Sequence, residues 1–233
     1  MRVATFNILH GLPTKGTTVD LDLLIAACRW LDADVLALQE VDRGVPRSHG
    51  HDLTAEVGNA LGGGGGGGGG MAYRFAPTLE RDGGQYGNAL LVRGTLDDVE
   101  ELRLPREGDR EPRGAILATA TVGDVVLSVA ATHLSVRKRE SGPQLDAVVA
   151  ALAGRDRPRL LLGDFNRRTA QVRPAVTAAG LTLAGGGPTF PAITPFRQID
   201  HVAVDGFTVE SAGAVATGMS DHRALVVELS AAS

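Results

Sequence analysis

Polar side chains of the types that bind metal ions or phosphate follow several apolar segments of this 233-residue sequence. Each stands directly after a run of apolar residues that is typical of a β-strand. Because strand ends converge at the edges of a sheet, we expect these side chains to gather at one edge and to form a single site. The set comprises Asn7, Glu40, His133, Asp164 with Asn166, Asp200 with His201, and Asp221 with His222.

Four members of this set are carboxylates, and neighbouring carboxylates repel one another unless a cation neutralises them. They are Glu40, Asp164, Asp200 and Asp221. Oxygen ligands favour Mg²⁺ or Mn²⁺, and Mg²⁺ typically binds one or two carboxylates together with a substrate phosphate. Zinc is the weaker alternative, because His133 and His222 lie roughly ninety residues apart in the sequence and lack the close spacing of histidine zinc motifs.

The segments that must position these residues alternate between strand and helix patterns. Helices are expected at Asp20–Asp32, Asp52–Leu61, Gln144–Leu152 and Val172–Ala179, and strands at Arg2–Leu9, Asp34–Leu38, Asn88–Val92, Gly114–Val122, Val125–Thr132, Arg159–Leu162, Ile199–Val204, Phe207–Ala216 and Ala224–Leu229. Hairpins such as the one around Gly123 interrupt the alternation, so we predict two packed sheets flanked by helices and not a doubly wound parallel sheet. Gln39 and Glu40 are expected at the carboxyl end of the second strand.

The composition indicates a protein with a substantial core and no general affinity for polyanions. Hydrophobic residues make up 43% of the chain, charged residues 21%, and the formal net charge is −4, which argues against a disordered chain and a broadly basic nucleic-acid binder. The length and the lack of a Pro-rich linker predict one domain over residues 1–233. The single Cys28 allows no internal disulfide, no apolar run predicts a transmembrane segment, and a cytoplasmic location is the default expectation.

One uninterrupted run of nine glycines extends from Gly62 to Gly70. Glycine offers no side chain to bury and loses the most backbone entropy on ordering. Phosphate-binding loops contain a few glycines with a Lys and a Ser or Thr, and this run has neither. We therefore predict a flexible insertion within the domain.

Six short motifs resemble those of the endonuclease/exonuclease/phosphatase superfamily, to which deoxyribonuclease I belongs. They occur in the order and approximate spacing of that superfamily and are Thr5-Phe6-Asn7-Ile8, Leu38-Gln39-Glu40-Val41-Asp42, Thr132-His133-Leu134, Gly163-Asp164-Phe165-Asn166, Ile199-Asp200-His201 and Ser220-Asp221-His222. The Gln-Glu-Val-Asp, Tyr86-Gly87-Asn88-Ala89 and Thr-His-Leu-Ser combination resembles the small bacterial metal-dependent hydrolases. The resemblance implies an α/β (α+β) fold, a four-layered α/β/β/α sandwich of two mostly antiparallel mixed sheets, and metal-dependent cleavage of phosphoester bonds.

The resemblance also implies a role for each matching residue. Glu40 resembles the principal metal ligand, with Asn7 and Asp221 as further ligands. Asp164 resembles the residue that orients or deprotonates the attacking water, and Asn166 one that holds this water or the phosphate. His222, supported by Asp200, resembles the histidine that contacts the scissile phosphate, and His133 resembles a second histidine on the other side of the phosphate.

The remaining candidates are substrate-binding residues, and each has a structural alternative. Arg167 directly follows the Asn166 motif and is placed to meet a substrate anion, whereas Tyr86 is as readily a packed loop residue and Arg113 as readily part of an ion pair. His201 is expected to support the structure. The histidines His10, His49 and His51 fall in loops and are expected to be exposed to solvent.

These observations predict a divalent-metal-dependent phosphoesterase that hydrolyses a phosphodiester or a phosphomonoester by in-line attack of water. The substrate stays open between a small molecule, a lipid headgroup and a nucleic acid. A nuclease acting on DNA or RNA is the main alternative, although the chain lacks a continuous basic track and has few aromatic residues for stacking. A binding module without catalysis is a further alternative. No obligate protein partner is indicated.

Overall fold

The computed structural model describes residues 1–62 and 70–232, and its strands form two six-stranded sheets. The first sheet has the order β11 (Phe207–Val215), β12 (Ala224–Ala231), β1 (Arg2–Asn7), β2 (Val35–Arg43), β4 (Gly84–Val92) and β3 (Ala72–Arg81). The second has the order β5 (Thr95–Arg103), β6 (Gly114–Val122), β7 (Val125–His133), β8 (Arg159–Asp164), β10 (Asp200–Asp205) and β9 (Thr182–Leu183). Only β1 with β2 and β7 with β8 pair in parallel among the described strands. The mostly antiparallel mixed sheets confirm the predicted fold class.

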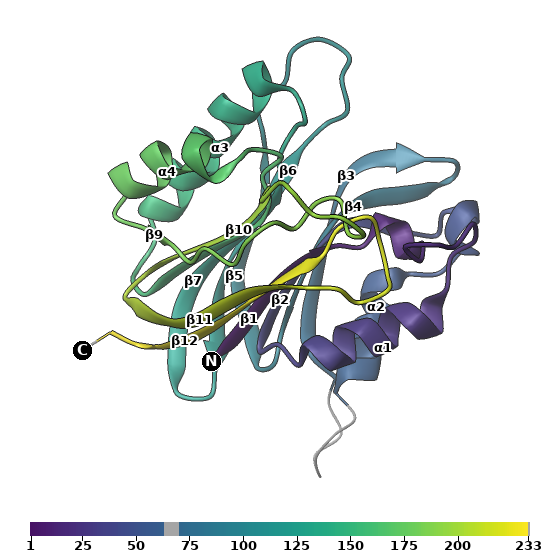
Figure 1. The fold of residues 1–233 in the computed structure, drawn as a ribbon, viewed down its shortest axis with the longest axis horizontal. Helices are drawn as coiled ribbons and strands as arrows, with labels where there is room; N and C mark the ends of the chain where they lie inside the picture. Colours follow the sequence, from purple (N-terminus) through teal and green to yellow (C-terminus); the bar gives the residue numbers. More distant parts are fainter. Residues whose placement is uncertain (63–69, 233) are drawn as a thin grey trace.

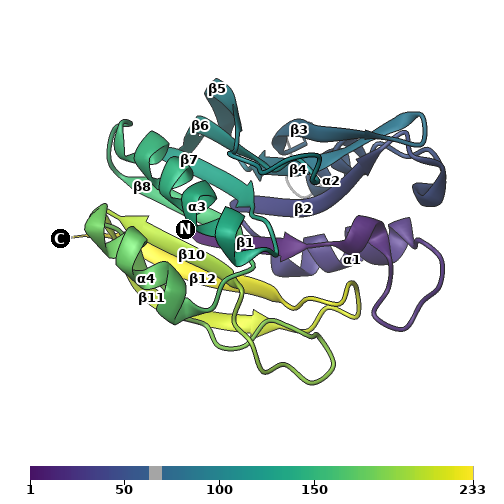
Figure 2. The same ribbon diagram turned by 90° about the horizontal axis from the view of Figure 1, so that it is seen from above.

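Helices cover the outer face of each sheet, so the molecule has the four predicted layers (Figures 1 and 2). The helices are α1 (Leu21–Leu31), α2 (Leu53–Leu61), α3 (Lys138–Ala153) and α4 (Thr169–Ala178), and short 3-10 turns lie at Leu9–Gly11 and Pro46–Ser48. Leu24 and Val57 of α1 and α2 pack against Phe6 of the first sheet. Val148 of α3 and Val176 of α4 share another apolar cluster with the second sheet.

The residues of β1 illustrate how one strand supplies two apolar layers. Val3 lies in the cluster between the two sheets, whereas Ala4 and Phe6 lie in the cluster under α1 and α2. Side chains of a strand alternate between its faces, so a strand buried on both faces is apolar almost throughout. This is why the two parallel pairs at the centres of the sheets were recognisable as short apolar runs.

The predicted end of the second strand at Leu38 is wrong. Strand β2 continues to Arg43, and its register against β4 shifts between Leu38, opposite Ala89, and Val41, opposite Gly87. One extra residue on β2 forms a β-bulge, which re-aims side chains without ending a strand. Glu40 lies in this bulge with φ of +60°, so the bulge and not a strand end presents its carboxylate.

Strands β3 and β5 were not predicted, and the start of α3 was placed too late. Both strands are sheet edges: β5 is mostly exposed and acidic, and β3 contains Pro77 at a register shift, where an edge tolerates proline. Helix α3 begins six residues before the predicted Gln144, and Pro143 lies within it. Proline usually interrupts a helix pattern, which hid the first turns.

The predicted flexible tract Gly62–Gly70 lies outside the described residues except for its first and last glycines. None of the helices in the described parts of the chain is long and apolar enough to cross a membrane.

Candidate active site

Residues at the same level of neighbouring strands form a row across the second sheet. The strand pairings align Gly114 with His133, His133 with Asp164, and Asp164 with Asp200. From the first sheet, Asn7 at the end of β1 donates hydrogen bonds to Glu40 Oε1 at 3.0 Å and to Asp164 Oδ2 at 3.2 Å. The predicted convergence of strand ends therefore joins both sheets at one edge.

Asp164 is the centre of this arrangement and is almost fully buried. Its Oδ1 accepts the backbone N–H of Asn166 at 2.9 Å. Its Oδ2 accepts from the side-chain amides of Asn7 at 3.2 Å and Asn166 at 3.4 Å, and it faces His133 Nε2 at 3.4 Å and His222 Nε2 at 3.8 Å. Burial, followed by the charge of Asp200, raises the pKa of Asp164 to about 7. A carboxylate with such a pKa can accept a proton near neutral pH, which suits a general base.

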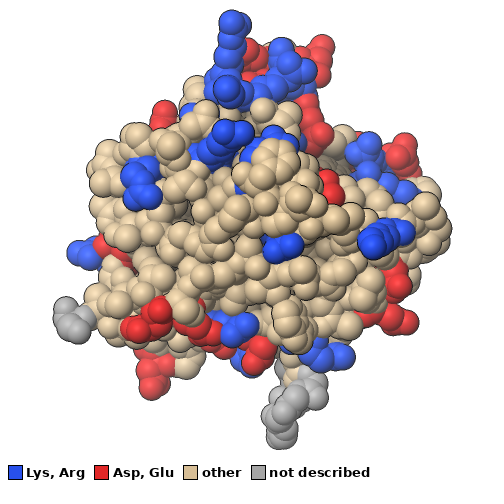
Figure 3. Space-filling model, in the orientation of Figure 1, with Lys and Arg blue, Asp and Glu red and all other residues tan. Residues whose placement is uncertain are grey.

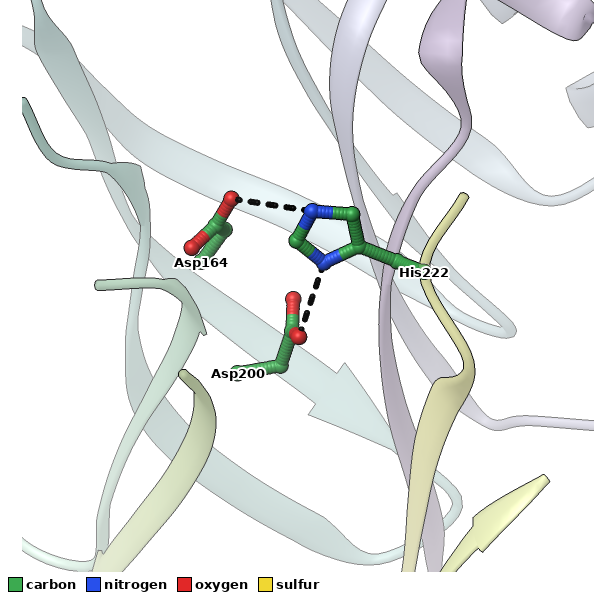
Figure 4. Close-up of side chains that lie close together, drawn as sticks. All are labelled: Asp164, Asp200 and His222. Atoms are coloured by element: carbon green, nitrogen blue, oxygen red, sulfur yellow. Dashed lines mark hydrogen bonds and ion pairs between the residues drawn. The ribbon is translucent and has the colours of Figure 1, made fainter. Parts of the chain in front are cut away.

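His222 lies between two carboxylates, as Figure 4 shows. Its Nδ1 lies 2.9 Å from Asp200 Oδ2, and its Nε2 faces Asp164. Burial alone would lower the pKa of His222, but the charges of Asp200 and Asp164 outweigh burial and raise it to about 10. His222 is therefore an imidazolium at neutral pH, and it holds the two carboxylates together.

The Asp164, Asp200 and His222 atoms lie within 4.8 Å of one another, which is close enough to surround a cation. A protonated imidazole has no lone pair for a metal, and its two N–H groups point to the carboxylates that flank it. The ion pairs of His222 with Asp200 and Asp164 thus account for the closeness of these three residues.

His133 is held in a different protonation state by Arg113. The guanidinium lies 3.0 Å from His133 Nδ1 and 2.9 Å from a Glu111 carboxylate oxygen. Because a guanidinium only donates hydrogen bonds, Nδ1 must accept, and the single imidazole proton is assigned to Nε2. Burial and then the charge of Arg113 lower the pKa of His133 well below its usual value. One neutral and one charged histidine thus present Nε2–H groups toward Asp164.

Glu40 is a partly buried carboxylate of the site that no cationic side chain balances. Its only described hydrogen bond is from Asn7, and no Lys or Arg lies within ion-pair distance of it in residues 1–62 and 70–232. Burial, and to a smaller extent the charge of Asp221, raise its pKa. A half-buried, unbalanced carboxylate beside a second one fits a divalent cation bound through oxygen. Asn7 Oδ1 accepts the Leu9 N–H at 3.1 Å, which leaves this oxygen one lone pair.

Several residues around this edge have strained backbone conformations. Glu40, Asn166, Ser220 and His10 all have φ between +49° and +69°, where residues with side chains are uncommon. Strained residues of this kind persist where surrounding contacts over-determine them, and they cluster at functional sites. The Asn166 amide shows such contacts, since it donates to the Leu134 carbonyl at 3.0 Å and to Asp164 Oδ2 at 3.4 Å.

Arg167 and Tyr86, which were also predicted to bind substrate, differ in their contacts and burial. The Arg167 guanidinium donates to the Lys138 carbonyl and to Ser141 on α3, and these contacts direct it to the helix. Tyr86 is buried, and burial followed by the charge of Glu40 raises its pKa. Asp221, which was predicted to bind the metal, is exposed, and its Oδ1 lies 3.4 Å from the Ser220 hydroxyl.

The remaining histidines fall outside the cluster. His201 is buried and its Nε2 lies 2.7 Å from the Arg167 carbonyl, so it contacts the backbone of the loop between β8 and α4. His49 is exposed, whereas His10 and His51 are partly buried, so the expectation of solvent exposure holds only for His49.

Two residues that support Asp200 and His222 were not found from the sequence. The Thr189 hydroxyl lies 3.3 Å from the backbone N–H groups of Ile199 and Asp200 and accepts from them, and the Phe190 ring packs 4.9 Å from the His222 ring. Both belong to the long loop between β9 and β10, which has no periodic pattern. A single sequence gives no signal for them, because their role depends on where the loop folds back.

Comparison with known proteins identifies the family. The sequence profile of the endonuclease/exonuclease/phosphatase family matches residues 4–222. The chain belongs to the endonuclease/exonuclease/phosphatase family. This match extends from β1 to His222 and includes every residue of the cluster.

Solved structures of the family share this fold. An endonuclease/exonuclease/phosphatase from Beutenbergia cavernae is 25% identical, with a TM-score of 0.82 over 99% of this chain and 71% of that one. A mannosyl-6-phosphatase from Bacteroides thetaiotaomicron is 17% identical, with a TM-score of 0.74 over 99% of each chain. The human Nocturnin catalytic domain, with bound sulfate, is 20% identical, with a TM-score of 0.72 over 100% of this chain and 94% of that one. No curated protein sequence matches this chain significantly.

Proposed function

We propose that this protein is a divalent-metal-dependent phosphoesterase in which Asp164 activates the attacking water. The observation that carries the proposal is the position of Asp164 Oδ2 among donor groups of Asn7, Asn166, His133 and His222. A general base must be close to the proton that it removes and must have a pKa near the working pH. The pKa of Asp164, raised to about 7, meets the second condition.

Each neighbouring side chain then acts on the phosphate or on the base. The imidazolium of His222 and the neutral Nε2–H of His133 would donate to nonbridging phosphate oxygens, where negative charge develops during displacement. Asp200 holds His222 in its charged form, and Asn166 holds Asp164 through its backbone N–H. Glu40, with Asn7 and Asp221, would bind Mg²⁺ or Mn²⁺, which supplies Lewis-acid stabilisation of the phosphoryl oxygens when bound.

The proposal is tested by hydrolysis of a panel of phosphoesters with and without Mg²⁺ or Mn²⁺. The panel includes aryl phosphomonoesters and phosphodiesters, sugar phosphates, lipid headgroups, RNA and plasmid DNA. Metal-dependent release of phosphate or alcohol from at least one class is expected. A complete lack of turnover, in a protein that still binds Mn²⁺ by calorimetry, would favour the binding-module alternative. Rapid plasmid nicking at physiological salt would instead favour a nuclease.

The activity is expected to have a bell-shaped pH profile. Asp164 must lose its proton to act as a base, so the acid limb should fall near pH 7, the value to which its pKa is raised. His222 must keep its proton to donate, so the alkaline limb should fall near pH 10. Asp200→Asn removes the negative charge that is the main cause raising the pKa of His222. It should therefore move the alkaline limb of kcat down by about two pH units. An unmoved alkaline limb would show that His222 does not set it.

A further inference from the structure

A cavity of about 410 Å³ lies beside the active site, between the edge strands of the two sheets. Its walls come from the middle of β3, the end of β5, the β5–β6 loop and the start of β6. Half of the lining is apolar, with Pro77, Leu104 and Ala115 among its residues. A cavity of this size and mixed character suits the organic part of a small substrate.

Arg113 forms the wall that the cavity shares with the catalytic residues. Its side chain is only 10% exposed, it lines the cavity, and its guanidinium contacts His133. The row of aligned residues that contains Asp164 and His133 extends to the cavity, because Gly114 pairs with His133 on one side and with Arg103 on the other. Adjacent strands lie about 4.8 Å apart, so the cavity lies roughly 10 to 15 Å from Asp164 along this row.

The charged residues of the cavity are mainly arginines. The Glu101 carboxylate pairs with Arg74. In contrast, Arg103 and Arg106 line the cavity without a carboxylate within ion-pair distance among the described residues. A guanidinium binds phosphate oxygens in a bidentate manner. Figure 3 shows Lys and Arg side chains, with acidic ones among them, over the end of the molecule that carries the β5–β6 loop and the start of α3.

The loop that closes the cavity is fixed to α3. Gln144 donates to the Pro105 carbonyl at 2.8 Å, and Glu140 accepts the Glu107 N–H at 3.2 Å and lies 3.3 Å from the Arg110 guanidinium. A wall that is held before the ligand arrives lowers the entropic cost of binding. The cavity is therefore a formed feature of the fold.

We infer that this cavity binds a second phosphate group of a small phosphoester, which Arg103 and Arg106 hold while the scissile phosphate lies at Asp164. This inference rests on the proposed function, and it names a substrate class for the same site. The substrate is then a molecule with two phosphates separated by a partly apolar linker. The apolar half of the lining contacts the linker, and the arginines select for the distant charge.

The test uses alkanediol bisphosphates of increasing chain length and the monophosphates of the same alcohols. We expect kcat/KM to be about tenfold higher for the bisphosphate than for the monophosphate at the length that spans the two sites. Arg103→Gln should reduce this ratio to near one. The matched control is Arg173→Gln on the exposed surface of α4, which should leave the ratio unchanged. A ratio that Arg103→Gln does not change would overturn the inference.

A binding measurement separates this inference from the proposed function. Calorimetry with a nonhydrolysable alkanediol bisphosphonate, with and without Mn²⁺, requires no turnover. Binding that weakens about tenfold in the Arg103→Gln/Arg106→Gln double variant supports the second-phosphate site even if no ester is hydrolysed. Equal binding by the double variant and the wild type contradicts the site even if hydrolysis is fast. An effect of Arg103→Gln on oligonucleotide cleavage alone would show that the distant phosphate belongs to a nucleic acid and would overturn the small-substrate inference.

Discussion

Asp164→Asn is expected to reduce kcat by about 1000-fold while leaving the fold intact. The amide keeps the size of the carboxylate and one acceptor oxygen for the Asn166 N–H, but it cannot take a proton from water. The donors around Oδ2 would then face a neutral group. Phosphate release at saturating Mg²⁺ measures the loss. Asp146→Asn on the exposed side of α3 is the matched control and should retain full activity.

The same substitution should not destabilise the protein, and this separates a catalytic role from a structural one. The pKa of Asp164 is raised above its unfolded value, so the folded state favours the protonated form. The ionised carboxylate therefore costs stability that grows as pH rises from about 4 to about 7 and stays constant above that. Asparagine carries no such cost, so the melting temperature of Asp164→Asn at pH 8 should equal or exceed that of the wild type. A melting temperature several degrees lower would mean that unfolding explains the lost activity.

Glu40→Gln is expected to raise the Mg²⁺ concentration for half-maximal activity by about 100-fold. Glutamine fills the same bulge of β2 and keeps the contact with Asn7, but it removes a partly buried carboxylate that lacks a cationic partner. The loss should therefore be in metal affinity, and high metal should restore most of kcat. Activity is titrated with Mg²⁺, and Mn²⁺ binding is measured by calorimetry.

Two variants make this second prediction specific. Glu210→Gln, on exposed β11 in the first sheet, is the matched control and should leave the metal requirement unchanged. His222→Ala should lower turnover but leave Mn²⁺ affinity close to that of the wild type, because His222 bonds Asp200 and Asp164 and not Glu40. Equal weakening of Mn²⁺ binding in Glu40→Gln and His222→Ala would contradict separate metal and phosphate roles.

The polar residues of the cluster were predictable because they follow apolar strands. Runs such as Leu160 to Leu162 are recognisable since both faces of a central strand are buried, and Asp164 follows directly. Glu40 was also among the predicted residues, although it was expected at a strand end and lies in a bulge of β2. A bulge depends on how β2 pairs with β4, which local sequence does not encode. The edge strands β3 and β5 were missed because exposed strands lose the apolar pattern.

The protonation states of the two histidines could not be predicted from the sequence, because they depend on tertiary contacts. His133 and His222 look alike in the chain, each a histidine near a strand. In the fold, burial and then the charge of Arg113 lower the pKa of His133, whereas the charges of Asp200 and Asp164 outweigh burial and raise the pKa of His222 to about 10. The pKa of a buried group is set by its neighbours in space.

The sequence by itself determined the family motifs, the sheet class and the identity of the clustered polar residues, because these follow from residue types and local periodicity. Tertiary structure decided what those residues do together. It placed Asp164 among several hydrogen-bond donors, left Glu40 without a cationic partner, and directed Arg167 to α3. It also opened the arginine-lined cavity beside His133. These features arise from contacts between residues far apart in the chain, where burial and neighbouring charges act across space.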